Sequence, residues 1–470
     1  MRRGSSVSLL AVVGLLLTAL PASAAVPTNV NVSRMKGNQS EAAIAVDPTN
    51  SQNVVVLSNL ESPGLMLGVS HDGGATFVRR QFANDTYPAH SFGLACCDPT
   101  MSWDDFGNLF MVWLDENDFG IIRIALSTDG GDTWAQIPAY QPAPPPRPRS
   151  AATLPVKTTD DPDDRGSAVD QPTVTTGDGA VWMVWNNKGI MQAVGAAVTG
   201  LGIVAPFGDD QNIPHTKGCS FGDVAVGPTG AVMQVCTRDA GKPKIAEIRT
   251  NVDPDGVGPD PFGASTLLGT TNVQQFEPIT PQHNRTVDSE TGLAWDRSGG
   301  LHDGRIYLIY TDSANPTSSQ TDVFMRTSDD GGNTWTDRVR VNAERRGAQF
   351  LPRIALDQTT GLVAVGWHDC QNDIGDNHFG DTDGIKNDDA MYYMTTTDGS
   401  GVFAPEIRVS KGVSNSADAN NGIDFGDYTG LAFQDGVAHP AWADNSDSTG
   451  DNPNGKLHQF DIYTASVPVT

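Results

Sequence analysis

The stretch STDGGDTW at 127–134 decides the fold, because the chain repeats it. It returns as SHDGGATF at 70–77 and as SDDGGNTW at 328–335, and a weaker copy, TTDGSGVF, stands at 396–403. In such a motif an acidic side chain accepts backbone N–H bonds across a tight turn, and two glycines adopt angles that a Cβ would forbid. We therefore interpret the motif as a structural turn whose aromatic end packs between sheets. The residues concerned are Asp72, Gly73, Gly74 and Phe77; Asp129, Gly130, Gly131, Thr133 and Trp134; and Asp330, Gly331, Gly332 and Trp335.

A longer repeat surrounds these turns. Each copy consists of a short apolar strand, a Gly/Asp turn and a second apolar strand, and most copies end on an aromatic residue. Repeats of this size with four short strands each are typical of β-propellers. We predict an all-β fold, a single β-propeller with seven four-stranded blades; six is the alternative, because the fourth copy has no clear outer strand pair. The seven copies lie at 42–61, 99–116, 171–187, 222–239, 292–312, 352–369 and 429–444.

The last repeat ends one strand short, after KLHQFDIYTAS. A spare strand, TNVNVS at 28–33, precedes the first repeat. Pairing the two would close the ring and remove both exposed sheet edges. We therefore predict that 28–33 completes the last blade.

The first residues are typical of a secretory signal peptide. Arg2 and Arg3 precede the apolar run LLAVVGLLLTAL, and an Ala-x-Ala pattern ends at Ala24. We expect the leader 1–24 to be removed and the propeller, 25–470, to be secreted and extracellular. The Pro-rich segment 141–166 is expected to be a surface loop between blades.

The five cysteines leave at least one without a partner. Cys219 and Cys236 flank a predicted hairpin and are the candidate disulfide. A bridge between the adjacent Cys96 and Cys97 would be strained. We therefore expect Cys97 and Cys370 to be buried thiols.

Composition narrows the classes of partner. The formal net charge of −26 repels nucleic acid and anionic membrane surfaces. No stretch after the leader approaches the ~20 apolar residues of a membrane span. The same acidity leaves carboxylates available for calcium.

The repeated motif, S-x-D-x-G-x-T-W, is the Asp box, and the chain resembles the sialidase superfamily and other secreted Asp-box (BNR-repeat) propellers. The resemblance implies that the Asp boxes join the two outer strands of a blade and lie opposite the active site. It also implies a monomer that binds an extracellular carbohydrate or glycoconjugate at a central funnel and cleaves it, with no required cofactor.

A sialidase-like site needs three arginines around a carboxylate, a tyrosine nucleophile activated by a glutamate, and an aspartate as acid and base. Arginine's planar fork suits the carboxylate. The Phe/Tyr-Arg-Ile-Pro motif that places the first arginine in that family is absent, and NVSRMKGNQSE stands there instead. The resemblance implies Tyr428 as nucleophile, Glu290 as its partner and Asp98 or Asp115 as acid, with Arg353 and Arg238 in the clamp and Arg34, Arg165, Arg345 or Arg346 as the third arginine.

Polar side chains stand where inner strands begin and second strands end, which is where a propeller builds its ligand face. We predict that Arg353, Asp427, Tyr428 and His368 converge on one funnel, with Asp427 and Asp369 among the substrate-binding residues. Capping of strand ends is the alternative role for each acid. The strand starts offer Glu41, Asp98, Asp170, Asp223, Glu290, Arg353, Asp424, Asp427 and Tyr428, and the strand ends offer Asn59, Asp115, Asn186, Arg238, Asp312, His368, Asp369 and Asp444.

Two other classes of function remain open. A polysaccharide lyase or endo-glycanase would use His368, beside Asp369, together with Tyr428 to move a proton. A non-catalytic propeller would use the same face only for binding. Three convergent arginines would favour a sialidase, and His and Tyr with one arginine or a metal would favour a lyase.

The loop DNHFGDTDGIKNDD at 376–389 is a candidate structural Ca²⁺ site. Hard oxygen ligands at alternating positions suit this ion, although the spacing is not that of an EF-hand. A solvated acidic loop is the alternative. The candidate ligands are Asp376, Asp381, Asp383 and Asp388, with Asp389 beside them.

Overall fold

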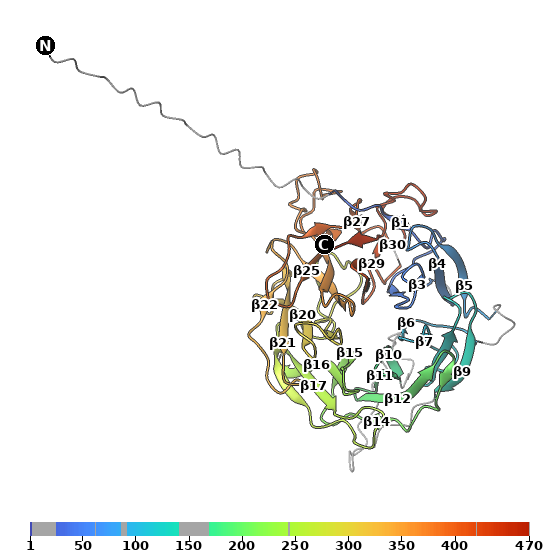
Figure 1. Ribbon diagram of the computed structural model, residues 1–470. Coiled ribbons are helices and arrows are strands. Elements are labelled where there is room, and N and C mark those ends of the chain that lie inside the picture. The colour runs from blue at the N-terminus through green and yellow to red at the C-terminus, as the bar shows by residue number, and fades with distance from the viewer. Residues whose placement is uncertain are drawn as a thin grey trace, which may run out of the picture.

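The computed structural model describes residues 1, 25–61, 63–85, 92–140, 169–242, 245–419 and 421–469. Over these residues it is a ring of seven antiparallel sheets with no helix (Figure 1). The described part of the chain therefore has no helix that is long and apolar enough to cross a membrane. The predicted leader, apart from Met1, and the Pro-rich segment 141–166 lie outside the described residues.

Each blade is an antiparallel meander whose first strand lies nearest the axis, so the predicted seven-bladed propeller is confirmed. Blades 1 and 2 hold β2 (Ala43–Val46), β3 (Val54–Asn59), β4 (Leu65–Ser70) and β5 (Val78–Phe82), then β6 (Thr100–Trp103), β7 (Leu109–Leu114), β8 (Ile122–Ser127) and β9 (Ala135–Tyr140). Blades 3 and 4 hold β10 (Val169–Gly177), β11 (Ala180–Asn187), β12 (Met191–Gly200), β13 (Ile203–Val204) and the short β14 (Gln211–Asn212), then β15 (Cys219–Val226), β16 (Val232–Lys242), β17 (Ile245–Asp253) and β18 (Thr266–Thr271).

Blades 5 and 6 hold β19 (Gly292–Trp295), β20 (Ile306–Ser313), β21 (Thr321–Ser328) and β22 (Val339–Arg340), then β23 (Gln349–Leu356), β24 (Val363–Asp369), β25 (Asp389–Thr397), β26 (Ile407–Arg408) and the short β27 (Ser414–Asn415). Blade 7 holds β28 (Gly430–Gln434), β29 (Val437–Asp444), β30 (Asp461–Thr464), β31 (Val467–Pro468) and β1 (Val30–Asn31). Blade 4 has its own outer pair, β17 and β18, which resolves the count in favour of seven.

Packing between neighbouring sheets explains the apolar second strands. Both faces of such a strand meet another sheet, so every residue of β3 and of β7 is buried. The aromatic ends fill the space between blades: Trp113, Trp185 and Trp367 have no exposed surface. Each hydrophobic cluster contains residues of adjacent blades, and the core is therefore a ring rather than a single centre.

The N-terminal strand closes this ring, as predicted. Val30 pairs with Thr464 and Asn31 with Tyr463, so β1 becomes the outermost strand of blade 7. Val32 N donates to Ile462 O at 2.8 Å and extends the contact. β30 is therefore paired on both sides instead of ending blade 7 as an open edge.

The disulfides differ in part from expectation. Cys219 and Cys236 are bonded across β15 and β16, as the hairpin suggested. Cys96 and Cys97 are also bonded to each other, so Cys97 is not a buried thiol. Cys370 is free and buried, and burial raises the pKa of its thiol.

The three full Asp boxes form nearly identical turns between the third and fourth strands of blades 1, 2 and 5. In blade 2, Asp129 accepts bonds from Ser127 Oγ at 2.8 Å and from Thr133 N at 2.9 Å. Trp134 Nε1 donates to Gly131 O at 3.0 Å, which holds the indole against the turn. Gly131 has φ 97°, and a Cβ there would lie 2.6 Å from Val55 Cγ2 of blade 1.

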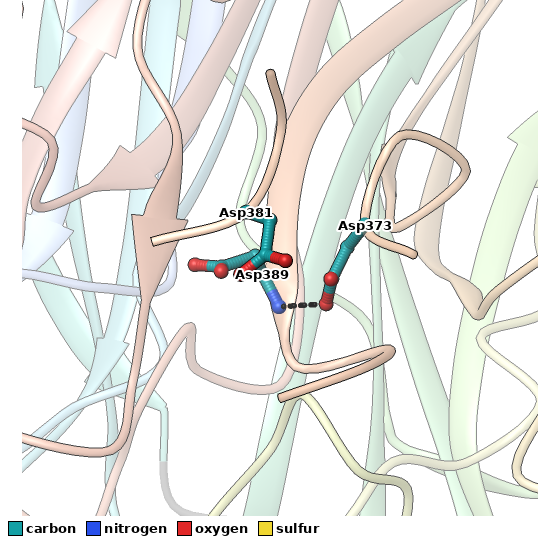
Figure 2. Close-up of side chains that lie close together, drawn as sticks. All are labelled: Asp373, Asp381 and Asp389. Atoms are coloured by element: carbon teal, nitrogen blue, oxygen red, sulfur yellow. Dashed lines mark hydrogen bonds between the residues drawn. The ribbon is translucent and has the colours of Figure 1, made fainter. Parts of the chain in front are cut away.

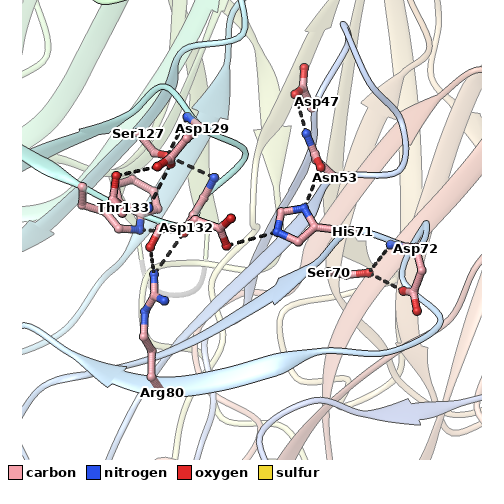
Figure 3. A network of polar contacts seen from close by, with 12 residues as sticks. Asp47, Asn53, Ser70, His71, Asp72, Arg80, Ser127, Asp129, Asp132 and Thr133 are labelled. Carbon is pink, nitrogen blue, oxygen red and sulfur yellow. Dashed lines mark hydrogen bonds and ion pairs between the residues drawn. The ribbon is translucent and has the colours of Figure 1, made fainter.

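Figure 3 shows that the first two Asp boxes also tie their blades together. His71 belongs to the first Asp box and contacts Asn53 Oδ1 of its own blade at 2.8 Å. It also contacts Asp132 Oδ1 of the second Asp box at 3.1 Å. Arg80 Nη2 donates to Asp132 O at 2.7 Å. The hydrogen bond from Thr76 Oγ1, with further bonds from Thr76 N and Ser70, lowers the pKa of Asp72 to about 2. The Asp72 carboxylate therefore stays ionised, and keeps its hydrogen bonds, at any ordinary pH.

We expect Asp129→Ala to lower the free energy of unfolding by about 1–2 kcal/mol, because the turn loses its acceptor for Ser127 and Thr133. Thermal or urea unfolding would measure this change. The exposed Asp209→Ala is the control and should unfold like the wild type. Equal stability of Asp129→Ala and wild type would contradict the structural role of the motif.

Candidate functional site

The same position recurs at the start of each inner strand. It lies two residues before the point from which the inner strand pairs regularly with the second strand of its blade. In most blades this residue has a positive φ, which is uncommon for residues other than glycine and collects at functional sites. The residues are Glu41 (φ 57°), Asp98 (φ 55°), Gln171 (φ 48°), Glu290 (φ 41°) and Leu351 (φ 50°).

Three of these residues, Asp98, Gln171 and Glu290, line one end of an axial cavity of about 310 Å³, which is lined by all seven inner strands. Asp98 and Gln171 lie on one side, from blades 2 and 3, and Glu290 and Arg353 lie opposite, from blades 5 and 6. Tyr428 of blade 7 stands between them. We call this end of the cavity the funnel. In blade 2, β6 and β8 end side by side, and the Asp box follows the end of β8. The Asp boxes therefore lie at the ends of the inner strands, opposite the funnel, as expected.

Asp98 and Asp170 form a carboxyl pair on the blade 2–3 side. Burial, followed by repulsion from Asp170 and Glu41, raises the pKa of Asp98 well above its ordinary value. Burial also raises the pKa of Asp170, while a hydrogen bond from the Asp98 carboxyl opposes the rise. Gln171 N donates to Asp98 Oδ2 at 3.1 Å, whereas Asp170 stays accessible to water although protein surrounds it.

Glu41 lies behind this pair and is only 3% exposed. Burial, followed by repulsion from Asp427, raises the pKa of Glu41 to about 8, while Arg285 opposes the rise. Asn59 Nδ2 and Asp427 N donate to its carboxyl. Arg285 forks onto Asp427 through Nε at 2.7 Å and through Nη2. The blade 7 side of the funnel thus contains a bidentate ion pair.

Glu290 is the counterpart across the funnel. Burial, followed by repulsion from Asp288, raises its pKa well above the ordinary range, and Arg353 opposes the rise. Asp288 itself accepts a bond from Glu290 N, and burial raises its pKa to about 8. Arg353 Nη2 lies 4.0 Å from Asp223 Oδ1. These surroundings favour the protonated form of the Glu290 carboxyl, which lies beside the Arg353 guanidinium.

Tyr428 is placed in the funnel but not as an activated nucleophile. Its Oη donates to Pro99 O at 3.4 Å. Burial, followed by repulsion from Asp98 and Glu41, raises its pKa well above 10. The phenol therefore keeps its proton, and its acidic neighbours are those two carboxyls rather than the Glu290 that the resemblance implied as its partner.

The loop between β18 and β19 crosses the funnel face from blade 4 to blade 7. Gln282 Nε2 donates to Gly426 O at 2.7 Å, and Asn284 N donates to Asp424 Oδ2 at 2.6 Å. This loop brings in Arg285 and Asp288, neither of which the strand register indicated. Their signal in the sequence is the polar run HNRTVDSE, which leads directly into the strand start at Glu290.

Three predicted site residues lie elsewhere. His368 is 1% exposed and packed between Phe350 and Phe425, so it does not line the funnel, and burial lowers its pKa to about 3. Asp369 is also buried and accepts Trp367 Nε1 at 2.7 Å. Arg238 pairs with Glu247 of β17. Second strands lie one step from the axis, so their ends are enclosed between blades.

The remaining arginine and acid candidates are also accounted for. Arg34 pairs with Asp451, and Arg345 and Arg346 are exposed near Glu344. Asp115 is buried and pairs with Arg123. Arg165 lies outside the described residues. In the described part of the chain, only Arg285 and Arg353 act on the funnel carboxyls, so three arginines do not converge there.

The predicted calcium loop gathers most of its carboxylates. Asp381, Asp383 and Asp388 fall into two groups that share Asp389, and each group brings its carboxyl oxygens within 4.8 Å of one another. Asp376 is exposed and lies outside both groups, because it accepts His378 N in a local turn. Asp373, three residues before the predicted loop, takes its place (Figure 2).

No family model and no curated protein matches the chain. Among solved structures, it is similar to a protein of unknown function from Dyadobacter fermentans, with 12% identity, a TM-score of 0.49 and 96% and 100% of the two chains covered. It is also similar to the endosialidase of phage phi92, with 10% identity, a TM-score of 0.48 and coverage of 94% and 69%. A third is the α-L-arabinofuranosidase Arb93A of Fusarium graminearum, with 14% identity, a TM-score of 0.44 and coverage of 73% and 93%. These are distant likenesses of fold.

The funnel carboxyls make stability depend on pH. Glu41 keeps its proton up to pH about 8 when folded but loses it from about 4.5 when unfolded. Its contribution is therefore fully present below pH 4.5 and is lost as pH rises through 8. We expect the wild type to lose unfolding free energy between pH about 5 and 8, and Glu41→Gln to lose less. Urea titrations at several pH values would measure both slopes, with Asp209→Asn as a control that should keep the wild-type slope.

Proposed function

We propose that this chain is a glycan-binding propeller that hydrolyses glycosidic bonds in an uncharged glycan at the funnel. One observation carries the proposal: Glu290 and Asp98 line opposite sides of one cavity, with Asp170 beside Asp98, and burial raises the pKa of the Glu290 carboxyl well above its ordinary value. Hydrolysis of a glycosidic bond needs this combination of an acid and a carboxylate on two sides of the sugar.

In the proposed reaction, Glu290 donates its proton to the leaving-group oxygen. Burial and repulsion from Asp288 raise its pKa, which favours the protonated form that a general acid needs. The ionised member of the Asp98–Asp170 pair acts on the opposite side, either on the sugar carbon or on an attacking water. Asp170 suits this role because its side chain is accessible.

The charge around the funnel favours an uncharged sugar. Arg285 is already engaged in a bidentate pair with Asp427, so Arg353 is the arginine that lines the funnel end of the cavity within the described residues. Arg297 lines the far end of the same cavity, where its Nη1 donates to Val226 O at 3.0 Å. The single guanidinium of Arg353, which already lies 4.0 Å from Asp223 Oδ1, is not the cluster of arginines that would hold the carboxylate of a sialic acid or uronate. His368 is buried, so the lyase mechanism loses its proton carrier.

We expect Glu290→Gln to lower kcat by roughly 10²–10⁴-fold, because the amide cannot donate the proton, while glycan affinity changes little. Turnover and binding would be measured on neutral polysaccharides, sialosides and uronate polymers. The wild-type rate should fall as pH rises through the pKa of Glu290.

Asp105→Asn is the matched control, because Asp105 lines the far end of the same cavity. It should keep wild-type turnover. Binding with no turnover of any substrate by the wild type would instead indicate a non-catalytic propeller. Turnover of sialosides but not of neutral glycans would contradict the substrate class while leaving the site in place.

We also propose that the protein acts outside the cell after cleavage near Ala24. The support is the basic start, the apolar run and the Ala-x-Ala pattern. We expect the exported protein to begin at about residue 25 when its N-terminus is sequenced. Retention of the leader in a membrane fraction would contradict secretion.

A further inference from the structure

A second group of ionisable side chains lies away from the funnel carboxyls, in the loop between β24 and β25. Asp373, Asp381 and Asp389 are all buried, and each brings a carboxyl oxygen within 4.8 Å of the other two (Figure 2). Asp383 and Asp388 form the second group with Asp389. The five carboxylates thus form two adjoining groups that share Asp389.

Backbone bonds hold this arrangement in place without using up its acceptors. Asp373 Oδ2 accepts Asp388 N at 2.8 Å and Asp389 N at 3.1 Å. Asp381 accepts Asn377 N at 2.7 Å and Gly384 N at 2.6 Å. A carboxylate offers about four lone-pair directions, so each side chain keeps capacity for a further partner. The loop is folded around its acids.

The group has no positive counterpart within the described residues. None of the ion pairs there involves any of the five carboxylates. The carboxylates of Asp383, Asp388 and Asp389 lie close enough to repel one another. Repulsion of this kind is relieved by a cation.

An independent observation identifies where that cation acts. Asp388 is 9% exposed, and its Oδ1 is buried without any hydrogen-bond partner. A buried carboxylate oxygen without a partner is costly, and native structures rarely keep one unless a water or an ion satisfies it. The carboxyl oxygens of the other four residues accept backbone or side-chain donors, so Asp388 is the member that has a buried oxygen without a partner.

We propose that Ca²⁺ binds here, with Asp388 and Asp389 as ligands and with Asp373, Asp381 and Asp383 around them. Two oxygens on opposite sides of a Ca²⁺ ion are about 4.6–5.2 Å apart, which suits groups held within 4.8 Å. Calcium accepts many carboxylates in an irregular arrangement, whereas Mg²⁺ keeps most of its waters. The site is independent of the proposed glycan chemistry.

The ion would also stabilise the junction of blades 6 and 7. Asn415 of β27 pairs with Asp389 and directs its side-chain amide toward Asp383 Oδ2 at 3.4 Å. The next residue, Ser416, donates to Pro281 O at 2.8 Å and accepts His283 N at 3.2 Å in the loop that crosses the funnel face. Calcium therefore adds order to 381–389 and, through β27, to 414–416.

The test uses the full mature chain after EDTA treatment and dialysis, with CaCl₂ as the probe and MgCl₂ in parallel. We expect Ca²⁺ at micromolar to millimolar concentration to raise Tm by several degrees, because it binds only the folded chain. Isothermal titration should show one ion per chain. Amide hydrogen exchange should slow in 381–389 and in 414–416.

Asp388→Asn should weaken Ca²⁺ binding at least tenfold, whereas Asp376→Asn, in the same loop but outside the group, should bind as the wild type does. Because Asp388→Asn removes a buried charge, the Tm of its calcium-free form should equal or exceed that of the calcium-free wild type. No Ca²⁺-dependent shift in the wild type, or equal weakening by both substitutions, would overturn the site. Calcium binding without slower exchange in 414–416 would overturn the link to β27.

Discussion

The pairing of β1 with β30 is the contact on which the rest of the structure depends. Two segments more than four hundred residues apart in the chain are held together there by a few backbone bonds. A propeller blade has no core of its own, because its apolar faces are covered only by the neighbouring blades. Closing the ring covers the apolar faces of blade 1 and blade 7 together. Only in the closed ring do the starts of all seven inner strands surround one axis.

That convergence brings acids together from distant parts of the chain. Glu41, Asp98 and Glu290 occupy the same position in three repeats, and each has the backbone conformation that an L-residue normally avoids. Desolvation then dominates their titration, because mutual repulsion adds to it and Arg285 and Arg353 offset only part. Such a cluster opposes folding at high pH, because its buried carboxyls must then carry charge. A strained, charged site commonly lowers the stability of the fold in this way.

The two ends of the strands have separate tasks. At one end the Asp boxes tie each outer turn to itself, and those of blades 1 and 2 are also linked to each other through His71 and Arg80. At the other end the strand starts and the crossing loop hold titratable groups that make few such local bonds. The fold therefore keeps its rigid, low-pKa carboxylates away from the raised-pKa carboxylates of the funnel.

The sequence by itself determined the repeat, and with it the number of blades, the closing strand, the position of the Asp boxes and the strand starts that face the axis. These features follow from local patterns that recur in each repeat. Such patterns can be recognised without knowledge of long-range contacts. Tertiary structure decided the rest. Arg285 and Asp288 reach the funnel through the loop between β18 and β19, which crosses to blade 7, and Asp373 replaces Asp376 because a turn brings it back onto Asp388 and Asp389. His368 follows the aromatic end of its strand like a ligand-facing residue, yet it is enclosed by Phe350 and Phe425. Which way a strand-end side chain points depends on the neighbouring blade, and no pattern within one repeat contains that information.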